Sequence, residues 1–215
     1  SWAKFPDFAD RYTAAVQRQI ALDRIMIGFH GTHAAPQTDI VAFPMLQDVN
    51  KGWLQIAREQ IPAQVLKEGK VAGKITLGVG GDYVNLDALV HDVKQMIDPV
   101  FRDAGDLIAI IGSDLLASDK GKLYAKQGDT PTEKERIEGS QIIATYGGLA
   151  SFVVPHFPAT GVLVTSWDNL SLYFQDSSWR RHVLENPRRS RVEDYNGRNE
   201  GYVIEQLEKF AAIEA

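Results

Sequence analysis

The first pattern of apolar positions along the chain lies between Asp7 and about Phe29. Apolar residues recur there near the 3.6-residue period of a helix, and no glycine interrupts them before Gly28. The members of this stripe are Phe8, Tyr12, Ala15, Val16, Ile20, Leu22, Met26 and Ile27. So wide a stripe needs a partner surface. The pattern therefore predicts one continuous helix, with Phe8, Tyr12, Leu22 and Met26 covered by strands from later in the chain.

The chain between His30 and about Phe101 alternates short apolar segments with breaks. His30–Pro44 predicts a loop, whereas Asp48–Ala57 places its apolar residues on one helical face. Lys67–Gly81 holds glycines at positions 69, 73, 78, 80 and 81, which predicts a turn-rich excursion. Helical spacing resumes from Asn85 to about Phe101. Since a residue before proline disfavours the helical conformation, we expect this helix to bend or end before Pro99.

The pattern then changes from helix-like to strand-like. Leu107–Ile111 is an unbroken apolar run, typical of a strand buried on both faces. We expect a helix from Ser113, a polar loop over Asp119–Pro131 and a helical segment from Thr132 to about Tyr146. Five short β-rich runs follow, at Phe152–Val154, Val162–Thr165, Leu170–Phe174, Trp179–Leu184 and Tyr202–Ile204. Helices early and strands late predict an α+β chain.

Composition narrows the class of protein. The 215 residues, 44% apolar and 24% charged, suit a globular protein with a sizeable core. A net charge of -5 argues against a general nucleic-acid binder, which needs a positive surface. The chain has no cysteine, which excludes disulfides and thiolate metal sites. No apolar run approaches the roughly 20 residues of a membrane helix, and no signal-peptide pattern is present at the N-terminus.

The best candidates for chemistry are His30, His33 and Asp39. Two imidazoles one helical turn apart can converge on one ion, and a metal-assisted hydrolase is the enzyme hypothesis that these residues allow. Gly31 and the predicted loop argue against it, because they remove the rigid support that two ligands need. A third hypothesis, an α/β binding module, requires a deep apolar pocket. The sequence therefore predicts no cofactor and no metal.

Charged residues of both signs cluster late in the chain. The basic members are Arg180, Arg181, Arg188, Arg189 and Arg191, and the acidic ones are Glu185, Glu193 and Asp194. On a monomer such a strip would be a solvated face whose ion pairs contribute little. In an assembly it could set the register of neighbouring subunits, because complementary charge gives specificity more than affinity. Both interpretations stay open, as does a contact with packaged nucleic acid.

Short strings over nearly the whole chain share one resemblance. The most specific are Pro44-Met45-Leu46-Gln47-Asp48-Val49, Gly52-Trp53-Leu54-Gln55, Gly80-Gly81-Asp82-Tyr83 and Leu86-Asp87-Ala88-Leu89-Val90. Further strings are Phe157-Pro158-Ala159, Asn169-Leu170-Ser171, Arg180-Arg181, Glu185-Asn186-Pro187, Arg191-Val192-Glu193 and Tyr202-Val203-Ile204-Glu205. In this order they resemble the major capsid protein of P2-like temperate tailed bacteriophages, or myophages. None of the strings has a catalytic rationale of its own.

The resemblance implies the Hong Kong 97-type capsid fold, with a long spine helix, an axial domain whose central sheet is flanked by helices, and a peripheral domain of long strands. It implies a division into residues 1–35 (spine helix, peripheral domain), 36–175 (axial domain) and 176–215 (returning peripheral strands). The implied function is a structural subunit of an icosahedral head, encoded by a phage or a prophage, and not an enzyme.

The partners implied by the resemblance are other subunits, in pentamers and hexamers, with scaffolding and portal proteins. The genome is implied only as the packaged content, and no membrane is involved. The implied location is the virion, after assembly in the host bacterial cytoplasm. Family members carry an N-terminal arm and an extended loop that would precede Ser1. We therefore expect the chain alone to form at most weak small oligomers and no closed shells at micromolar concentration.

Overall fold

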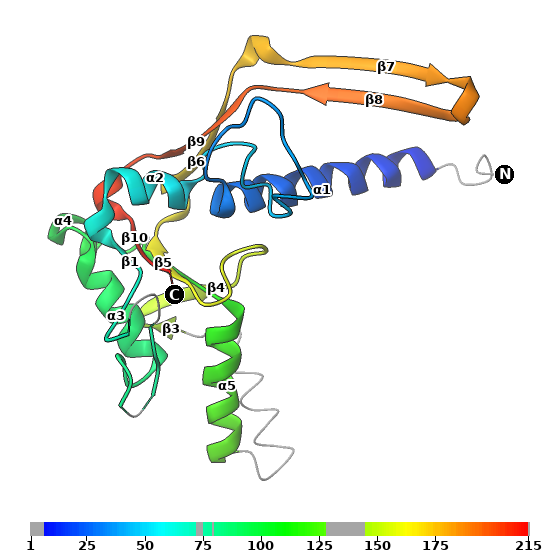
Figure 1. Cartoon of the computed structure of the whole chain (residues 1–215). Coiled ribbons are helices and arrows are strands. Elements are labelled where there is room, and N and C mark those ends of the chain that lie inside the picture. The colour runs from blue at the N-terminus through cyan, green and yellow to red at the C-terminus, as the bar shows by residue number, and fades with distance from the viewer. Residues whose placement is uncertain (1–6, 72–74, 79, 128–144, 215) are drawn as a thin grey trace.

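The fold combines a central mixed sheet with helices and a long two-stranded arm (Figure 1). The computed structural model describes residues 7–71, 75–78, 80–127 and 145–214. The helices are α1 (Phe8–His30), α2 (Trp53–Gln60), α3 (Leu86–Met96), α4 (Pro99–Arg102) and α5 (Ser113–Gln127). No helix within these ranges is long and apolar enough to cross a lipid bilayer.

The central sheet has six strands in the order β1-β10-β5-β2-β4-β3. Its strands are β1 (Val65–Leu66), β2 (Ile108–Ile111), β3 (Thr145–Tyr146), β4 (Leu149–Phe152), β5 (Val162–Thr165) and β10 (Ala211–Ile213). The two middle strands, β2 and β5, are antiparallel and every one of their residues is buried. Burial on both faces is typical of an unbroken apolar run such as β2, whereas β5 ends in the polar Thr165. Strand β10 pairs with β5 on one side and β1 on the other, so the C-terminal segment ends inside the sheet.

Two apolar clusters cover the two faces of this sheet. On one face Ala109 and Ile111 pack against α3, through Leu86, Leu89, Val90 and Val93. On the other face Ile108 and Ile110 pack with Phe29 of α1, with Trp53 and Leu54 of α2, and with Phe210. The end of α1 is therefore part of the core.

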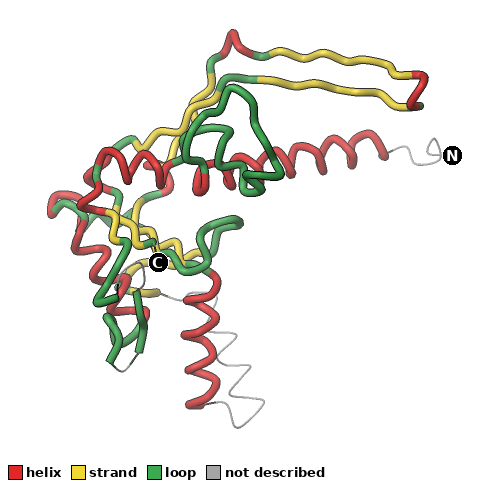
Figure 2. Tube along the Cα trace, viewed as in Figure 1, coloured by secondary structure: helices red, strands yellow, loops and turns green. Residues whose placement is uncertain are grey.

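Helix α1 is continuous, as predicted, but its environment differs from the prediction. Its C-terminal end is buried at Gly28 and Phe29, whereas residues 10–21 are exposed on all sides. Tyr12 is 62% exposed, so the prediction that late strands cover it is wrong. Leu22 and Met26 are half-buried, and the side chain of Phe8 lies outside the described residues. The first half of α1 projects from the rest of the chain as an arm (Figures 1 and 2).

The late strands form a second arm made of two antiparallel ribbons. Strand β6 (Leu170–Phe174) pairs with β9 (Glu200–Ile204), and β7 (Arg180–Asn186) pairs with β8 (Arg191–Gly197). Short 3-10 turns punctuate this part of the chain at Trp167–Asn169, Asp176–Ser178, Pro187–Arg189 and Leu207–Lys209, as another does earlier at Pro62–Gln64. The β6–β9 ribbon packs on the core through Tyr202 and Ile204, and the β7–β8 ribbon extends beyond it in the direction of α1 (Figure 1).

The turn-rich excursion predicted at Lys67–Gly81 is confirmed where it is described. The Asp82 carboxylate accepts hydrogen bonds from the amides of Lys70 (2.6 Å) and Thr76 (2.8 Å) and from the Thr76 hydroxyl (2.7 Å). These bonds lower the pKa of Asp82 to about 2, the Lys70 amide contributing most. Gly78 and Gly80 have φ of 128° and 82°, values that favour glycine.

Other predicted elements are confirmed in part. The helical spacing from Asn85 gives α3 and then α4, separated by a break before Pro99 as expected. The helix predicted at Asp48–Ala57 begins only at Trp53, because residues before Gly52 form turns. The predicted loop at Asp119–Pro131 is wrong as far as Gln127, where α5 continues.

The remaining differences concern residues 128–152 and the late strands. Most of the helix predicted from Thr132 lies outside the described residues, and its expected end, Thr145–Tyr146, is strand β3. Strand β4 ends at Phe152, where the predicted strand begins. The predictions at Val162–Thr165 and Leu170–Phe174 are confirmed, and those at Trp179–Leu184 and Tyr202–Ile204 fall on β7 and β9.

Candidate interaction surface

The β7–β8 ribbon is largely uncovered within the described chain. Of its strand residues, only Asn186 and Glu193 are half-buried and all others are exposed. Its register places Val183 opposite Asp194 on one face, and His182 opposite Tyr195 on the other. Each face of the ribbon therefore carries both apolar and polar or charged side chains. Neither face has the purely polar composition expected of a surface that only contacts water.

Apolar side chains on the ribbon are solvent-accessible on both faces. The exposed fraction is 50% for Val183, 45% for Leu184, 64% for Val192 and 55% for Tyr195. A two-stranded ribbon on its own is only marginally stable in water. Burial of these side chains by another surface would therefore stabilise the ribbon.

The structure brings most of the predicted charged strip onto this ribbon. Arg181 pairs with Asp194 across the strands through two hydrogen bonds of 3.1 and 2.9 Å, and Arg191 pairs with Glu193 at 2.6 Å. Arg180 begins β7, while Arg188 and Arg189 lie in the turn at the tip. These three arginines have no ion-pair partner within the described ranges. The tip of the ribbon is thus basic.

Hydrogen bonds favour the ionised form of two acidic members of the strip, Asp194 and Glu193. The guanidinium of Arg181 lowers the pKa of Asp194, and the Tyr195 hydroxyl, followed by Arg191, lowers the pKa of Glu193. Both arginines and Asp194 are open to solvent, and only Glu193 is half-buried, so the pairs contribute little to stability. These ion pairs therefore fix the positions of charges on the ribbon more than they stabilise it.

Helix α1 presents a second uncovered surface on the same side of the chain. Tyr12, Val16 and Ile20 are spaced four residues apart and are 62%, 39% and 38% exposed. Residues at this spacing lie on one face of a helix. The sequence predicts the helix correctly here, but within the described residues no element covers this apolar face to the extent predicted.

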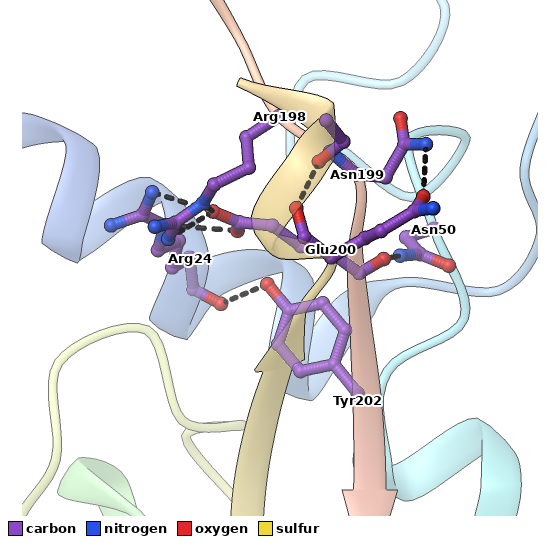
Figure 3. A network of polar contacts seen from close by, with 8 residues as sticks. Arg24, Asn50, Arg198, Asn199, Glu200 and Tyr202 are labelled. Carbon is purple, nitrogen blue, oxygen red and sulfur yellow. Dashed lines mark hydrogen bonds and ion pairs between the residues drawn. The ribbon is translucent and has the colours of Figure 1, made fainter.

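A polar network joins the bases of the two arms (Figure 3). The Glu200 carboxylate accepts two hydrogen bonds from Arg24 of α1, at 2.9 and 2.6 Å, and two from Arg198, at 2.9 and 2.7 Å. The Tyr202 hydroxyl donates to the Arg24 carbonyl at 2.8 Å, and the Asn50 amide donates to the Glu200 carbonyl at 2.7 Å. The network therefore connects α1, the loop before α2, and β9.

Burial and hydrogen bonding act in opposite directions on Glu200. Burial on its own would raise the pKa of this carboxyl, but the hydrogen bonds from Arg24 and Arg198 outweigh it, and the pKa ends below its ordinary value. Glu200 is therefore ionised at neutral pH. Burial raises the pKa of the Tyr202 hydroxyl, which remains a donor. Sequence reasoning missed this network, because Arg24 and Glu200 are 176 positions apart.

The residues of the metal hypothesis do not form a cluster. His30 donates from Nε2 to the His156 carbonyl at 2.7 Å, and His33 contacts the Thr32 hydroxyl through Nδ1 at 2.9 Å. Asp39 accepts hydrogen bonds from two amides of its own turn. Among the described residues no group of three His, Asp or Glu side chains is placed to hold a metal ion. The hydrolase hypothesis therefore has no structural support.

Acid is expected to weaken the fold through His30. Burial is the main cause that lowers the pKa of this imidazole below its usual 6.5. The unfolded chain therefore binds the proton first, so the contribution of neutral His30 is complete above pH 6.5 and is lost as the pH falls through the folded-state pKa. We expect His30→Gln, which keeps a donor for His156, to flatten the pH dependence of the free energy of unfolding between about pH 7 and 5. Urea denaturation over this range measures it, and an unchanged slope would contradict the assignment.

Comparisons with known proteins agree with one another. The family model described as "Phage major capsid protein, P2 family" matches residues 1–215. The protein named "Capsid proteins" of Escherichia phage P2 is 39% identical over 222 residues, covering 99% of this chain and 61% of the relative. The "Major capsid protein" of Serratia phage KSP20 is 33% identical over 220 residues, covering 100% of this chain and 63% of the relative.

A solved structure is similar to this chain in its backbone fold as well as in its sequence. A chain of the "Satellite phage P4 procapsid including size determination (Sid) protein" matches with a TM-score of 0.85 and 37% identity. The match covers 99% of this chain and 65% of that one. This confirms the α+β fold as that of a phage capsid protein. The chain spans less than two thirds of the length of each of these relatives.

Proposed function

The chain belongs to the P2 family of phage major capsid proteins, and from that premise we propose that it is a structural subunit of an icosahedral phage or prophage head. The observation that carries the proposal is the pair of uncovered arms, α1 and the β7–β8 ribbon. Elements that bury so little within one chain suit repeated contacts with other copies on a closed lattice. The role is structural and not catalytic.

We propose that the β7–β8 ribbon contacts a neighbouring subunit. The contact residues are Arg180, Arg181, Arg188, Arg189, Arg191, Glu193 and Asp194, with the apolar Val183, Leu184, Val192 and Tyr195 between them. Apolar burial would supply the affinity of this contact, and the basic tip and paired charges would set its register. Exposed charges form a salt-sensitive rim, so each contact is weak and the lattice depends on many of them.

The wider organisation follows from the family. We propose pentamers and hexamers of the whole protein, with scaffolding and portal proteins as further partners and the genome as the enclosed content. The place of action is the virion, after assembly in the bacterial cytoplasm. Within the chain, residues 1–35 and 176–215 are proposed as the peripheral domain and residues 36–175 as the axial domain. Strand β10 is an exception to this division, because it lies within the central sheet, between β1 and β5.

Reversing the charges at the ribbon tip is expected to weaken self-association. The variant Arg188→Glu/Arg189→Glu makes the tip acidic, and two exposed charge reversals should weaken association of the chain about tenfold. Sedimentation velocity from about 10 to 300 μM, in low and high salt, measures this association. The expected parent behaviour is a weak small oligomer that high salt dissociates.

The matched control is Lys51→Glu/Lys67→Glu, which changes the net charge equally at exposed positions away from the ribbon. This control should associate as the parent does. Equal weakening in both variants would reveal a general charge effect and exclude the ribbon contact. Absence of any association in the parent would contradict the proposal as well.

A further inference from the structure

The carboxylate of Glu200 is shared by two arginines from different parts of the chain. Its Oε1 accepts from Nη2 of Arg24 at 2.6 Å and from Nη2 of Arg198 at 2.7 Å. Only 17% of the Glu200 side chain is exposed. Two guanidinium groups that reach one oxygen atom lie close together, and the carboxylate between them offsets their repulsion.

Arg198 also anchors the root of the ribbon. Its guanidinium carbon lies 4.2 Å from the centre of the Phe174 ring, at the end of β6. Beside it, the Asn199 amide donates to the Ser178 hydroxyl at 2.9 Å, and the Gln175 amide donates to the Asn199 carbonyl at 3.1 Å. The strands that enter and leave the β7–β8 ribbon are therefore held together at this level.

Beyond this level the ribbon has no polar tie to the rest of the described chain. Side-chain hydrogen bonds and ion pairs of residues 180–197 join two members of the ribbon in every case. The first half of α1 is likewise exposed. Because both arms are uncovered, their relative direction depends on the joint where Arg24, Arg198 and Glu200 meet (Figure 3).

We propose that Glu200 is a positioning residue that fixes the direction of the β7–β8 ribbon relative to α1, by clamping Arg24 and Arg198 against each other. The consequence for assembly rests on the proposed function, since that direction would set the angle at which copies meet. The clamp itself is a property of the single chain. If Glu200 only stabilised the fold, its loss would lower stability without changing the distance between the arms.

The absence of cysteine from the chain allows a direct test. Gln17→Cys on α1 and Val192→Cys on β8, both at exposed positions, provide the two attachment sites for nitroxide labels. Pulsed electron paramagnetic resonance on the dilute labelled chain then gives the distribution of distances between the arms. We expect Glu200→Gln to broaden this distribution and shift it to longer distances, because the two arginines repel each other.

Glu205→Gln is the matched control, since it makes the same substitution on the same strand region at a carboxylate that accepts from Tyr173 and no arginine. It should leave the distribution unchanged. Adding Arg198→Gln to Glu200→Gln, or raising the salt, should give a distribution narrower than that of Glu200→Gln, because the repulsion is removed or screened, but broader than that of the parent, which keeps the clamp. Melting temperatures measured alongside separate positioning from stability.

An unchanged distribution in Glu200→Gln, an equal shift in Glu205→Gln, or a shift that ignores both salt and Arg198→Gln would each overturn the proposal. If Glu200→Gln does not fold, Arg198→Gln alone decides: it removes half of the clamp and must broaden the distribution. Because the measurement needs no association, it stands apart from the sedimentation test of the ribbon contact. The distance measurement can therefore contradict the role of Glu200 while the sedimentation test supports the ribbon contact, and the reverse is also possible.

Discussion

Replacing Gly28 by alanine is expected to destabilise the chain by about 1 to 3 kcal/mol, although alanine is the better helix former. Gly28 lies inside α1, where the ring of Trp53 packs against its backbone. A methyl group at this position would lie 2.3 Å from Cζ3 and 2.6 Å from Cε3 of Trp53. The indole cannot retreat easily, because it stacks edge-on against Phe29 and Tyr202 and donates to the Ser171 carbonyl at 3.0 Å.

Gly121→Ala is the matched control for this prediction. Gly121 lies in α5, and a methyl group there meets nothing within 4 Å. Helix propensity alone should then raise the free energy of unfolding by about 0.5 to 1 kcal/mol. Urea denaturation of the two variants and the parent measures both effects. Opposite signs are expected, and stabilisation by Gly28→Ala would show that the Trp53 contact is not tight.

The role of Gly28 illustrates what apolar periodicity can and cannot predict. The spacing predicts α1 to about Phe29, and the helix ends at His30. The sequence does not show, however, that Gly28 leaves space for the ring of Trp53. Periodicity also predicts a cover for Tyr12, which is exposed. A pattern reports that a side chain is apolar, whereas its cover depends on elements far away in sequence, or on another chain.

The strands also divide into those that the sequence predicts and those that it does not. Strand β2 is an unbroken apolar run, which the sequence predicts because burial on both faces favours apolar residues. Strand β5 is buried as well, but it ends in Thr165, whose hydroxyl accepts a hydrogen bond from Asn169. Strand β8 was not predicted, because its residues are mostly polar and pair with β7 in an exposed ribbon. The sequence nevertheless predicts the charge cluster that β7 and β8 carry, whose members we propose as contact residues. Glu200 was not found, since its partner Arg24 gives no local signal.

Replacing Asn169 by alanine is expected to lower the free energy of unfolding by at least about 2 kcal/mol, because each buried polar group left without a partner costs about 1 to 3 kcal/mol. Asn169 is 2% exposed. Its side-chain nitrogen donates to the Thr165 hydroxyl at 2.9 Å and to the Gln206 backbone carbonyl at 3.0 Å, and its Oδ1 accepts from the Gln206 backbone amide at 2.7 Å. The Asn169 side chain therefore connects β5 to the segment that leads into β10.

Asn169→Asp sharpens this prediction, because it keeps the acceptor for the Gln206 amide and loses the donors. At neutral pH the new carboxylate would face the carbonyl of Gln206 in a buried site, which raises its pKa in the folded state. The folded chain would then bind the proton first, so the penalty relative to the parent should shrink as the pH falls through that raised pKa. Asn196→Ala, on the exposed ribbon, serves as the control and should change stability by no more than about 0.5 kcal/mol. Urea denaturation at several pH values measures all three variants. A penalty for Asn169→Asp that is independent of pH would show that this side chain is not held against carbonyl groups.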